Sequence, residues 1–231
     1  MDGKDDRIVQ GGMDSIVNIN DGGTGFIVGD HEIATAAHNV YDLVNKSWRN
    51  ERIIKLPDEY GIADASTTLT PVSVHIPNEY KQFSYNDSGR FTYDYALITV
   101  KEDLSQYSHF GLGIPYHYTS ATFKEYNIYV TGYPTDLKDD NSKEVPVSSK
   151  RLYTGRGKIT GFSNNMPSYN TDTSGGDSGA PVYVKELYKS GGKTIEQNTV
   201  IGIHVAGSST SNGCVPMDAM KLKFFVNNPN A

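Results

Sequence analysis

The chain has 231 residues, of which 27 are acidic and 21 basic, so its formal net charge is −6 at neutral pH. This acidic balance, with a pI of about 5.5, argues against a nucleic-acid-binding protein. A hydrophobic fraction of 37% is enough for a folded core, but no window of the sequence approaches the roughly 18–20 apolar residues of a membrane-spanning helix.

The first residues, 1–7, are polar and acidic and lack an apolar segment. We therefore expect no signal peptide in this chain: either it has been removed or the protein is cytosolic. Cys214 is the single cysteine, so no intrachain disulfide can form and a small disulfide-stapled scaffold is excluded. The length suits one large all-β domain, or two small barrels that share one active site, without a linker.

Short runs of β-branched and aromatic residues, bounded by Gly, Pro, Asn and Asp, recur along the chain and predict an antiparallel all-β protein with little helix. In chain order, the predicted strands cover residues 15–20, 25–35, 52–56, 72–76, 95–101, 127–132, 157–162, 180–185 and 199–206. The glycine-containing stretch 189–193 predicts a turn that closes a long hairpin between the last two strands. Met217, Met220 and Phe224 recur at helical spacing before Pro229 and predict a short C-terminal helix.

The segment 174–181 reads SGGDSGAP, a glycine-rich turn that delivers Ser178 just before an apolar strand. A serine hydroxyl is a poor nucleophile at neutral pH, so it needs a base for its proton and backbone N–H groups for the developing oxyanion. The glycines beside Ser178 permit a tight backbone turn. Considered alone, this fragment also fits an ordinary glycine-rich loop.

Two further segments make the catalytic interpretation stronger. Residues 35–38 read TAAH at the end of one predicted strand, and residues 94–98 read DYALI at the start of another. His38 can serve as the base, and a buried Asp94 can hold the imidazole in one tautomer. In these three segments, taken in this order, the chain resembles the chymotrypsin-like serine peptidases, whose motifs are T-A-A-H, D-x-A-L and G-D-S-G-x-P.

The resemblance covers most of the chain, from His38 to about Phe225. It implies two antiparallel six-stranded β-barrels with a short C-terminal helix, the N-terminal barrel over about 8–115 and the C-terminal barrel over about 116–231. It also implies His38 as general base, Asp94 as its orienting carboxylate and Ser178 as nucleophile, with the N–H groups of Gly176 and Ser178 as the oxyanion hole. Neither a metal nor an organic cofactor is required.

Other residues compete for these roles. His31 lies in the predicted turn 29–32, where we expect it to be solvated. Asp64 and Asp87 also lie between the base and the nucleophile in the chain, but neither precedes an apolar strand as Asp94 does.

The substrate pocket in such a fold is built by the segment before the nucleophile and by a later strand, here residues 202–207. His204 is an unusual choice for that strand, because an unpaired polar group is costly to bury. An imidazole that faces the pocket can bind a carboxylate. In this respect the chain is similar to the bacterial glutamyl endopeptidases of the staphylococcal and bacillary type, in which a Thr five residues before the nucleophile and a His in a G-I-H segment bind the glutamate side chain. Thr173 and His204 occupy those places.

Asp172 supports a different specificity, because trypsin-like enzymes keep the aspartate that attracts Lys or Arg six residues before the nucleophile. Glutamate specificity requires Asp172 to turn away from the pocket or to bond elsewhere.

Taken as a whole, the resemblance implies a secreted, monomeric bacterial endopeptidase that cleaves proteins after Glu, less readily after Asp. The alternatives are a trypsin-like endopeptidase that cleaves after Lys or Arg, and a non-catalytic binding module.

The N-terminal stretch 7–12, RIVQGG, resembles a trypsin-type activation junction. Cleavage after Arg7 would free the amine of Ile8, which could pair with Asp177 and order the pocket of a zymogen. An expression-derived leader is the alternative.

A cluster of acidic residues, Asp136, Asp139, Asp140 and Glu144, could offer oxygen ligands to calcium. The cluster has no recognisable ligand spacing, however, and predicts a solvated loop.

Overall fold

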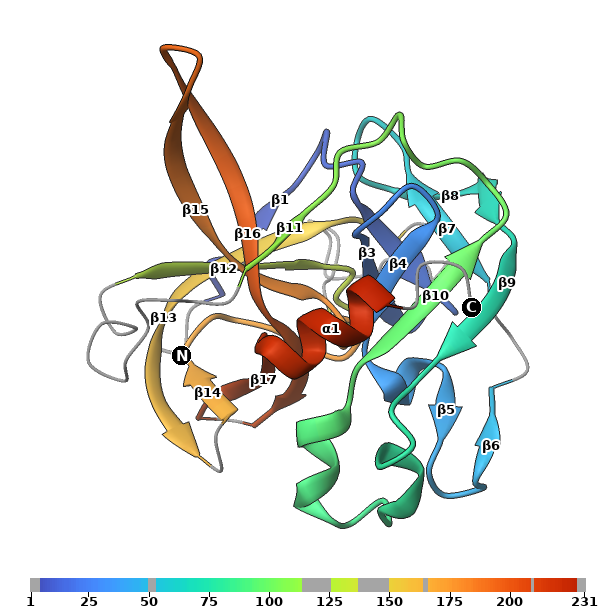
Figure 1. Cartoon of the computed structure of the whole chain (residues 1–231). Coiled ribbons are helices and arrows are strands. Elements are labelled where there is room, and N and C mark those ends of the chain that lie inside the picture. The colour runs from blue at the N-terminus through green and yellow to red at the C-terminus, as the bar shows by residue number, and fades with distance from the viewer. Residues whose placement is uncertain are drawn as a thin grey trace.

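The computed structural model describes residues 5–49, 53–113, 126–136, 150–163, 166–208 and 210–227. Two β-sheets lie side by side, and one α-helix, α1 (Ala219–Asn227), crosses between them (Figure 1). No helix in the described ranges is long and apolar enough to cross a membrane. The all-β prediction with a short C-terminal helix is confirmed.

The first sheet follows the order β8-β7-β2-β3-β4-β10-β9. Its strands are β2 (Ile16–Ile19), β3 (Gly23–Ile27), β4 (Glu32–Thr35), β7 (Ile54–Pro57), β8 (Ala63–Leu69), β9 (Pro71–His75) and β10 (Ala96–Val100). Only Thr70 separates the two edge strands along the chain, so β8 and β9 can be counted as one bent strand of a curled, half-barrel sheet.

The second sheet contains a closed ring of six strands, because β13 pairs with both β12 and β14. The ring consists of β12 (Asn127–Gly132), β13 (Tyr153–Ser163), β14 (Met166–Tyr169), β15 (Pro181–Ser190), β16 (Lys193–Gly207) and β17 (Asn212–Pro216). Two short strands join it, β1 (Ile8–Val9) on β13 and β11 (Gly111–Leu112) on β16. The predicted boundary near residue 115 lies outside the described residues.

Short elements complete the structure. They are the hairpin of β5 (Tyr41–Asp42) and β6 (Ser47–Trp48) and the 3₁₀ helices η1 (Ala37–Asn39), η2 (Tyr80–Gln82) and η3 (Ser88–Tyr93). One buried cluster joins the two sheets: Phe26 and Leu97 come from the first sheet, and Tyr183 and Ile203 from the second.

Every predicted strand overlaps an observed one, but the single strand predicted over 25–35 is wrong. It is two strands, β3 and β4, joined by a turn at Gly29, whose carbonyl accepts a hydrogen bond from the Glu32 N–H. Residue 52 of another predicted strand lies outside the described residues. The predicted turn near 189–193 is confirmed: Gly191 and Gly192 have φ angles of 57° and 78°, which few other residues adopt, and the long hairpin they close projects from the molecule (Figure 1).

Candidate active site

His38 and Asp94 form a pair at one end of the first sheet. The register of the sheet explains their approach: Thr35 of β4 lies opposite Ala96 of β10, so the residues that follow Thr35 meet those that precede Ala96. His38 then lies in η1, and Asp94 caps the end of η3.

The Asp94 carboxylate is fully buried and holds His38 with both oxygens. Its Oδ2 lies 2.8 Å from the imidazole Nδ1, and its Oδ1 accepts the His38 backbone N–H at 2.9 Å. The guanidinium of Arg90 adds a positive charge 3.8 Å from Oδ2. This arrangement fixes the ring orientation and favours the tautomer with the proton on Nδ1, leaving Nε2 free to accept a proton.

The loop before β15 presents Ser178. Gly176 and Gly179 have φ angles of 95° and 87°. A Cβ atom added to Gly176 would lie 2.1 Å from the Tyr133 carbonyl oxygen, and one added to Gly179 would lie 2.2 Å from the Thr24 carbonyl oxygen. Only glycine fits these positions.

The N–H groups of this loop divide into two kinds. Those of Asp177, Gly179 and Ala180 donate to backbone carbonyls. Within the described part of the chain, the N–H groups of Gly176 and Ser178 have no such acceptor. Two unengaged donors on either side of Asp177 are available for an oxyanion.

Asn39 ties the histidine segment to the serine loop. Its side-chain amide donates to the Ser178 carbonyl at 2.8 Å and to Thr35 Oγ1 at 2.9 Å. Thr24 reinforces this connection, because its backbone N–H also donates to the Ser178 carbonyl and its hydroxyl donates to the Gly176 carbonyl at 2.7 Å. The two halves of the site are thus held by a common hydrogen-bond network.

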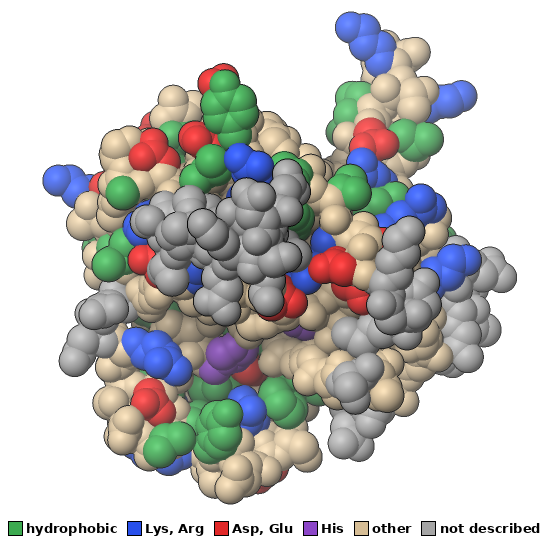
Figure 2. Space-filling model, turned by 180° about the vertical axis from the view of Figure 1, so that it is seen from behind, with side chains coloured by type: hydrophobic (Ala, Val, Ile, Leu, Met, Phe, Trp, Pro, Cys, Tyr) green, Lys and Arg blue, Asp and Glu red, His purple; other side chains and the backbone are tan. Residues whose placement is uncertain are grey.

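Among the described residues, the structure has no hydrogen bond between Ser178 Oγ and His38. Such catalytic bonds are often long before substrate binds. The His38 side chain is 27% exposed, and Figure 2 shows histidine side chains in a hollow of the molecular surface. The His38 side chain is therefore accessible from the molecular surface.

A pocket of about 350 Å³ adjoins the serine, and its lining includes Thr173, Ser178 and His204. The pairing of β15 with β16 brings His204 here: the Gly179 N–H donates to the His204 carbonyl, and the His204 N–H donates to the Ala180 carbonyl. The predicted pocket residues thus line one cavity beside the predicted nucleophile.

His204 is 3% exposed, and its Nδ1 lies 2.5 Å from the hydroxyl of Tyr169, a fully buried residue of β14. Burial, with a smaller contribution from His38, lowers the pKa of His204 to about 3. The imidazole is therefore neutral near pH 7, and Nε2 is its other hydrogen-bonding atom.

Asp172 does not line this pocket. Its Oδ2 accepts the backbone N–H of Asp6 at 3.3 Å, on the side where the N-terminal segment runs. The carboxylate is thus engaged away from the cavity, as glutamate specificity requires.

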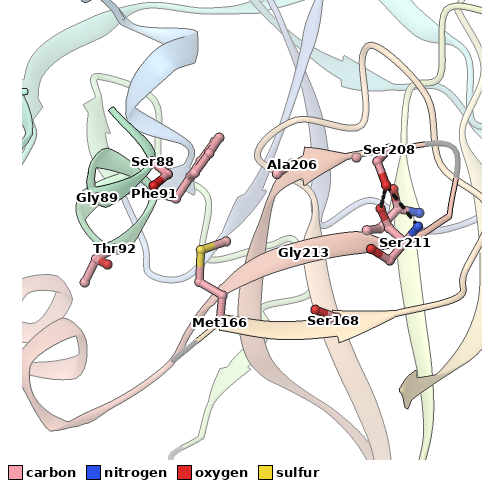
Figure 3. Close-up of a pocket in the computed structure, with 12 residues that line it drawn as sticks. Ser88, Gly89, Phe91, Thr92, Met166, Ser168, Ala206, Ser208, Ser211 and Gly213 are labelled. Carbon is pink, nitrogen blue, oxygen red and sulfur yellow. Dashed lines mark hydrogen bonds between the residues drawn. The ribbon is translucent and has the colours of Figure 1, made fainter. Parts of the chain in front are cut away.

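A second cavity, of about 370 Å³, continues from the first and shares Ala206, Gly207, Ser208 and Asn212 with it. Figure 3 shows Phe91 of η3 on one side of this cavity and Met166 of β14 on the other. The two cavities therefore adjoin each other beside Ser178.

The competing residues lie in other settings. His31 is in the β3–β4 turn, Asp87 caps the start of η3 through the Gly89 N–H, and Asp64 accepts hydrogen bonds from exposed Ser66. Among the described residues, no group of three or more His, Cys, Asp or Glu side chains could hold a metal ion. Asp136 pairs with Arg7, and Asp139, Asp140 and Glu144 lie outside the described residues.

Sequence reasoning missed Asn39, Thr24, Arg90 and Tyr169. Asn39 directly follows the proposed base, which is a local signal, but an isolated Asn, Thr or Tyr has no motif that reveals a contact with a distant segment.

The chain is similar in sequence to known peptidases. The family model described as "Trypsin-like peptidase domain" matches residues 23–186, a range that includes His38, Asp94 and Ser178. The chain is 26% identical over 161 residues to a glutamyl endopeptidase of Bacillus licheniformis, covering 69% of this chain and 44% of the relative. It is 37% identical over 90 residues to a glutamyl endopeptidase of Staphylococcus aureus, covering 38% and 21%. The matches thus span less than half of each relative.

Solved structures share the fold. A Glu endopeptidase in complex with MPD aligns with a TM-score of 0.75 at 20% identity and covers 99% of both chains. A human heparin binding protein aligns with a TM-score of 0.66 at 10% identity over 98% of both chains. A peptidase and a heparin binding protein therefore share this fold, so the function has to be inferred from the residues of the site and not from the fold.

Proposed function

Because this chain belongs to the trypsin-like peptidase family, we propose that it is a serine endopeptidase that hydrolyses protein chains after glutamate and, less readily, after aspartate. The observation that carries the proposal is the single pocket lined by Thr173, Ser178 and His204. The bacterial glutamyl endopeptidases among its relatives support the same substrate class.

Catalysis would begin when His38 Nε2 takes the proton of Ser178 Oγ, which attacks the carbonyl carbon of the scissile bond. The oxyanion would receive hydrogen bonds from the N–H groups of Gly176 and Ser178, which have no other acceptor among the described residues. The imidazolium, stabilised by Asp94, would then give its proton to the leaving amine. Water would hydrolyse the acyl-enzyme by the same steps, with His38 again as the base.

Glutamate recognition would rest on neutral hydrogen bonds. A neutral His204 whose Nδ1 accepts the Tyr169 hydroxyl must carry its proton on Nε2, the form that donates to a carboxylate. The 3.4 Å contact of Tyr169 with the Gly213 carbonyl is a weaker alternative for that hydroxyl than the 2.5 Å contact with His204. Thr173 would supply a hydroxyl donor.

The engagement of Asp172 with Asp6 argues against the trypsin-like alternative, since no carboxylate among the described residues lining the pocket could attract Lys or Arg. The intact set of His38, Asp94 and Ser178 argues against a non-catalytic binding module. Secretion from a bacterium and a monomeric state are further parts of the proposal, tested by fractionation of cultures and by light scattering.

The decisive experiment is mass spectrometry of the peptides released from casein by the protein, with Ser178→Ala as the control. We expect cuts after Glu and some after Asp, and none with the variant. Cuts after Lys or Arg would contradict the assignment of Thr173 and His204. Cleavage that survives Ser178→Ala would contradict the nucleophile.

A further inference from the structure

Asp177, the residue between the two oxyanion donors, is a buried carboxylate with 3% of its surface exposed. Its Oδ2 accepts the Ser174 N–H at 2.9 Å, so its side chain points back under the loop. Burial raises the pKa of Asp177 to about 7. An ionised carboxylate in this place is costly unless a positive charge lies close to it.

Arg7, in the N-terminal segment of the chain, supplies such a charge. Its side chain is only 6% exposed, and its NH1 lies 4.0 Å from Asp177 Oδ2. The guanidinium also makes two hydrogen bonds of 3.1 Å to Asp136 and bonds of 2.9 and 2.7 Å to Asp5. It is therefore held in a fixed position under the serine loop.

The segments around Arg7 and Asp136 are attached to the same region. Ile8 of β1 lies opposite Thr154 of β13, which anchors the N-terminal segment on the barrel. Thr135, next to Asp136, donates to the Gly175 carbonyl from both its N–H, at 2.7 Å, and its hydroxyl, at 2.9 Å. The guanidinium thus connects β1, the end of β12 and the serine loop.

We propose that the Arg7 guanidinium is the internal counter-charge of Asp177 and holds the serine loop in its active arrangement while the Arg7–Ile8 peptide bond is intact. The activation hypothesis requires the freed amine of Ile8 beside Asp177. In the structure Arg7 is there instead, and Ile8 is 63% exposed on β1. Cleavage after Arg7 would separate the counter-charge from β1 and the barrel, and under this proposal it is not needed for activity.

Arg7 acts as a positioning residue. If Asp177 lost its counter-charge and turned toward water, the peptide units on either side would rotate and the Gly176 and Ser178 N–H groups would no longer point to one oxyanion. Such a change reduces turnover more than substrate binding, because the donors act mainly in the transition state.

The activity test rests on the proposed function. We would measure kcat and KM on a glutamyl peptide for the unmodified protein and for Arg7→Gln, Arg7→Lys and Arg156→Gln, a matched control at an exposed position of β13. Intact-mass spectrometry would verify the Arg7–Ile8 bond in each sample. We expect the intact protein to be active. Arg7→Gln should lower kcat roughly 10- to 100-fold and leave KM within about twofold of its original value. Arg7→Lys should retain part of the activity, and Arg156→Gln should have no effect. Activity that appears only after cleavage at Arg7–Ile8, or Arg7→Gln as active as Arg156→Gln, would overturn the proposal.

Thermal unfolding tests the counter-charge without relying on activity. Asp177 is faced by Arg7 and, as further titratable groups, Asp5, Asp136 and Tyr169. Since its folded-state pKa is raised, its contribution to stability falls as the pH rises from its usual value of about 4 toward about 7. Arg7→Gln should therefore lower the melting temperature more at pH 8, where Asp177 is ionised, than at pH 5.5, and Asp177→Asn should abolish this difference in the double variant.

The two tests separate the two proposals. If the protein shows this melting pattern but has no peptidase activity, either intact or cleaved, the proposed function is contradicted. The role of Arg7 as the counter-charge of Asp177 is then still supported. Equal losses at both pH values would overturn the counter-charge, whatever the activity.

Discussion

Individual residues in the pocket determine which protonation state would recognise the proposed substrate. His204 is buried, neutral and bonded to Tyr169, so under the proposed function it would bind a carboxylate through a directional N–H donor rather than through an ion pair. A neutral donor distinguishes Glu from Lys but less strongly from Gln, which lacks the negative charge that strengthens a hydrogen bond.

Because His204 is neutral, we predict that the preference for Glu over Gln peptides does not depend on pH. Since the pKa of His204 is about 3 and a free glutamate side chain is ionised above about pH 6, neither group changes its charge at higher pH. We expect the ratio of kcat/KM for matched Glu and Gln peptides to stay constant from pH 6 to pH 9, although turnover itself varies. A ratio that falls through neutral pH would show that a protonated His204 binds the substrate.

Tyr169→Phe tests the tautomer. Without the hydroxyl, His204 Nδ1 loses its donor and the ring can place its proton on either nitrogen. We expect kcat/KM for a Glu peptide to fall about tenfold, the equivalent of one hydrogen bond, with little change for a Gln peptide. Tyr60→Phe, at a tyrosine that is 62% exposed, is the control. Equal losses for both peptides would assign Tyr169 a structural role only.

At the scale of elements, the register of paired strands converts distant positions into one site. The β4–β10 pairing joins His38 to Asp94, and the β15–β16 pairing joins Ser178 to His204. The connection between these two pairs depends on Asn39 of η1, which holds the serine loop through the Ser178 carbonyl.

Asn39→Ala would remove the side-chain donor of this connection and leave the Ser178 carbonyl with one donor, the Thr24 N–H. We expect a loss of about 1–3 kcal/mol in the free energy of unfolding and a lower kcat with nearly unchanged KM. Denaturant titration and steady-state kinetics would measure both. Asn45→Ala, in an exposed turn, should change neither, and an Asn39→Ala protein with normal stability and kcat would contradict this connecting role.

At the scale of the whole molecule, the two sheets share one buried core. A continuous buried cluster crosses between them, and α1 covers the junction by packing Phe224 and Phe225 on Tyr95, with ring centroids 4.9 and 6.0 Å away. Because Tyr95 follows Asp94, the helix packs beside the segment that carries the Asp94 carboxylate, more than half the chain away in sequence.

Phe225→Ala should therefore destabilise the whole molecule by about 3–5 kcal/mol rather than loosen the helix alone. We expect urea unfolding followed by fluorescence and by far-UV circular dichroism to show one shared, shifted transition. Val226→Ala, at a 67% exposed position of the same helix, should leave the transition in place. A separate early transition would indicate that α1 unfolds independently.

The sequence by itself determined the elements whose physical cause is local. Alternating apolar residues predicted the core strands, Gly191 and Gly192 predicted the hairpin turn, and helical spacing predicted α1. Strands such as β8, with largely exposed residues, and β17, with Gly and Pro, lack this pattern and were missed, because pairing with neighbouring strands stabilises them. The motifs around His38, Asp94 and Ser178 were recognisable because each occupies a short segment.

Only the tertiary structure decided the contacts between segments. Whether Asp172 faces the pocket, whether His204 is charged, and which cation lies beside Asp177 depend on Asp6, Tyr169 and Arg7, which come from elsewhere in the chain. A local sequence pattern does not encode these partners, because burial and electrostatic interactions depend on distance in space and not on separation along the chain.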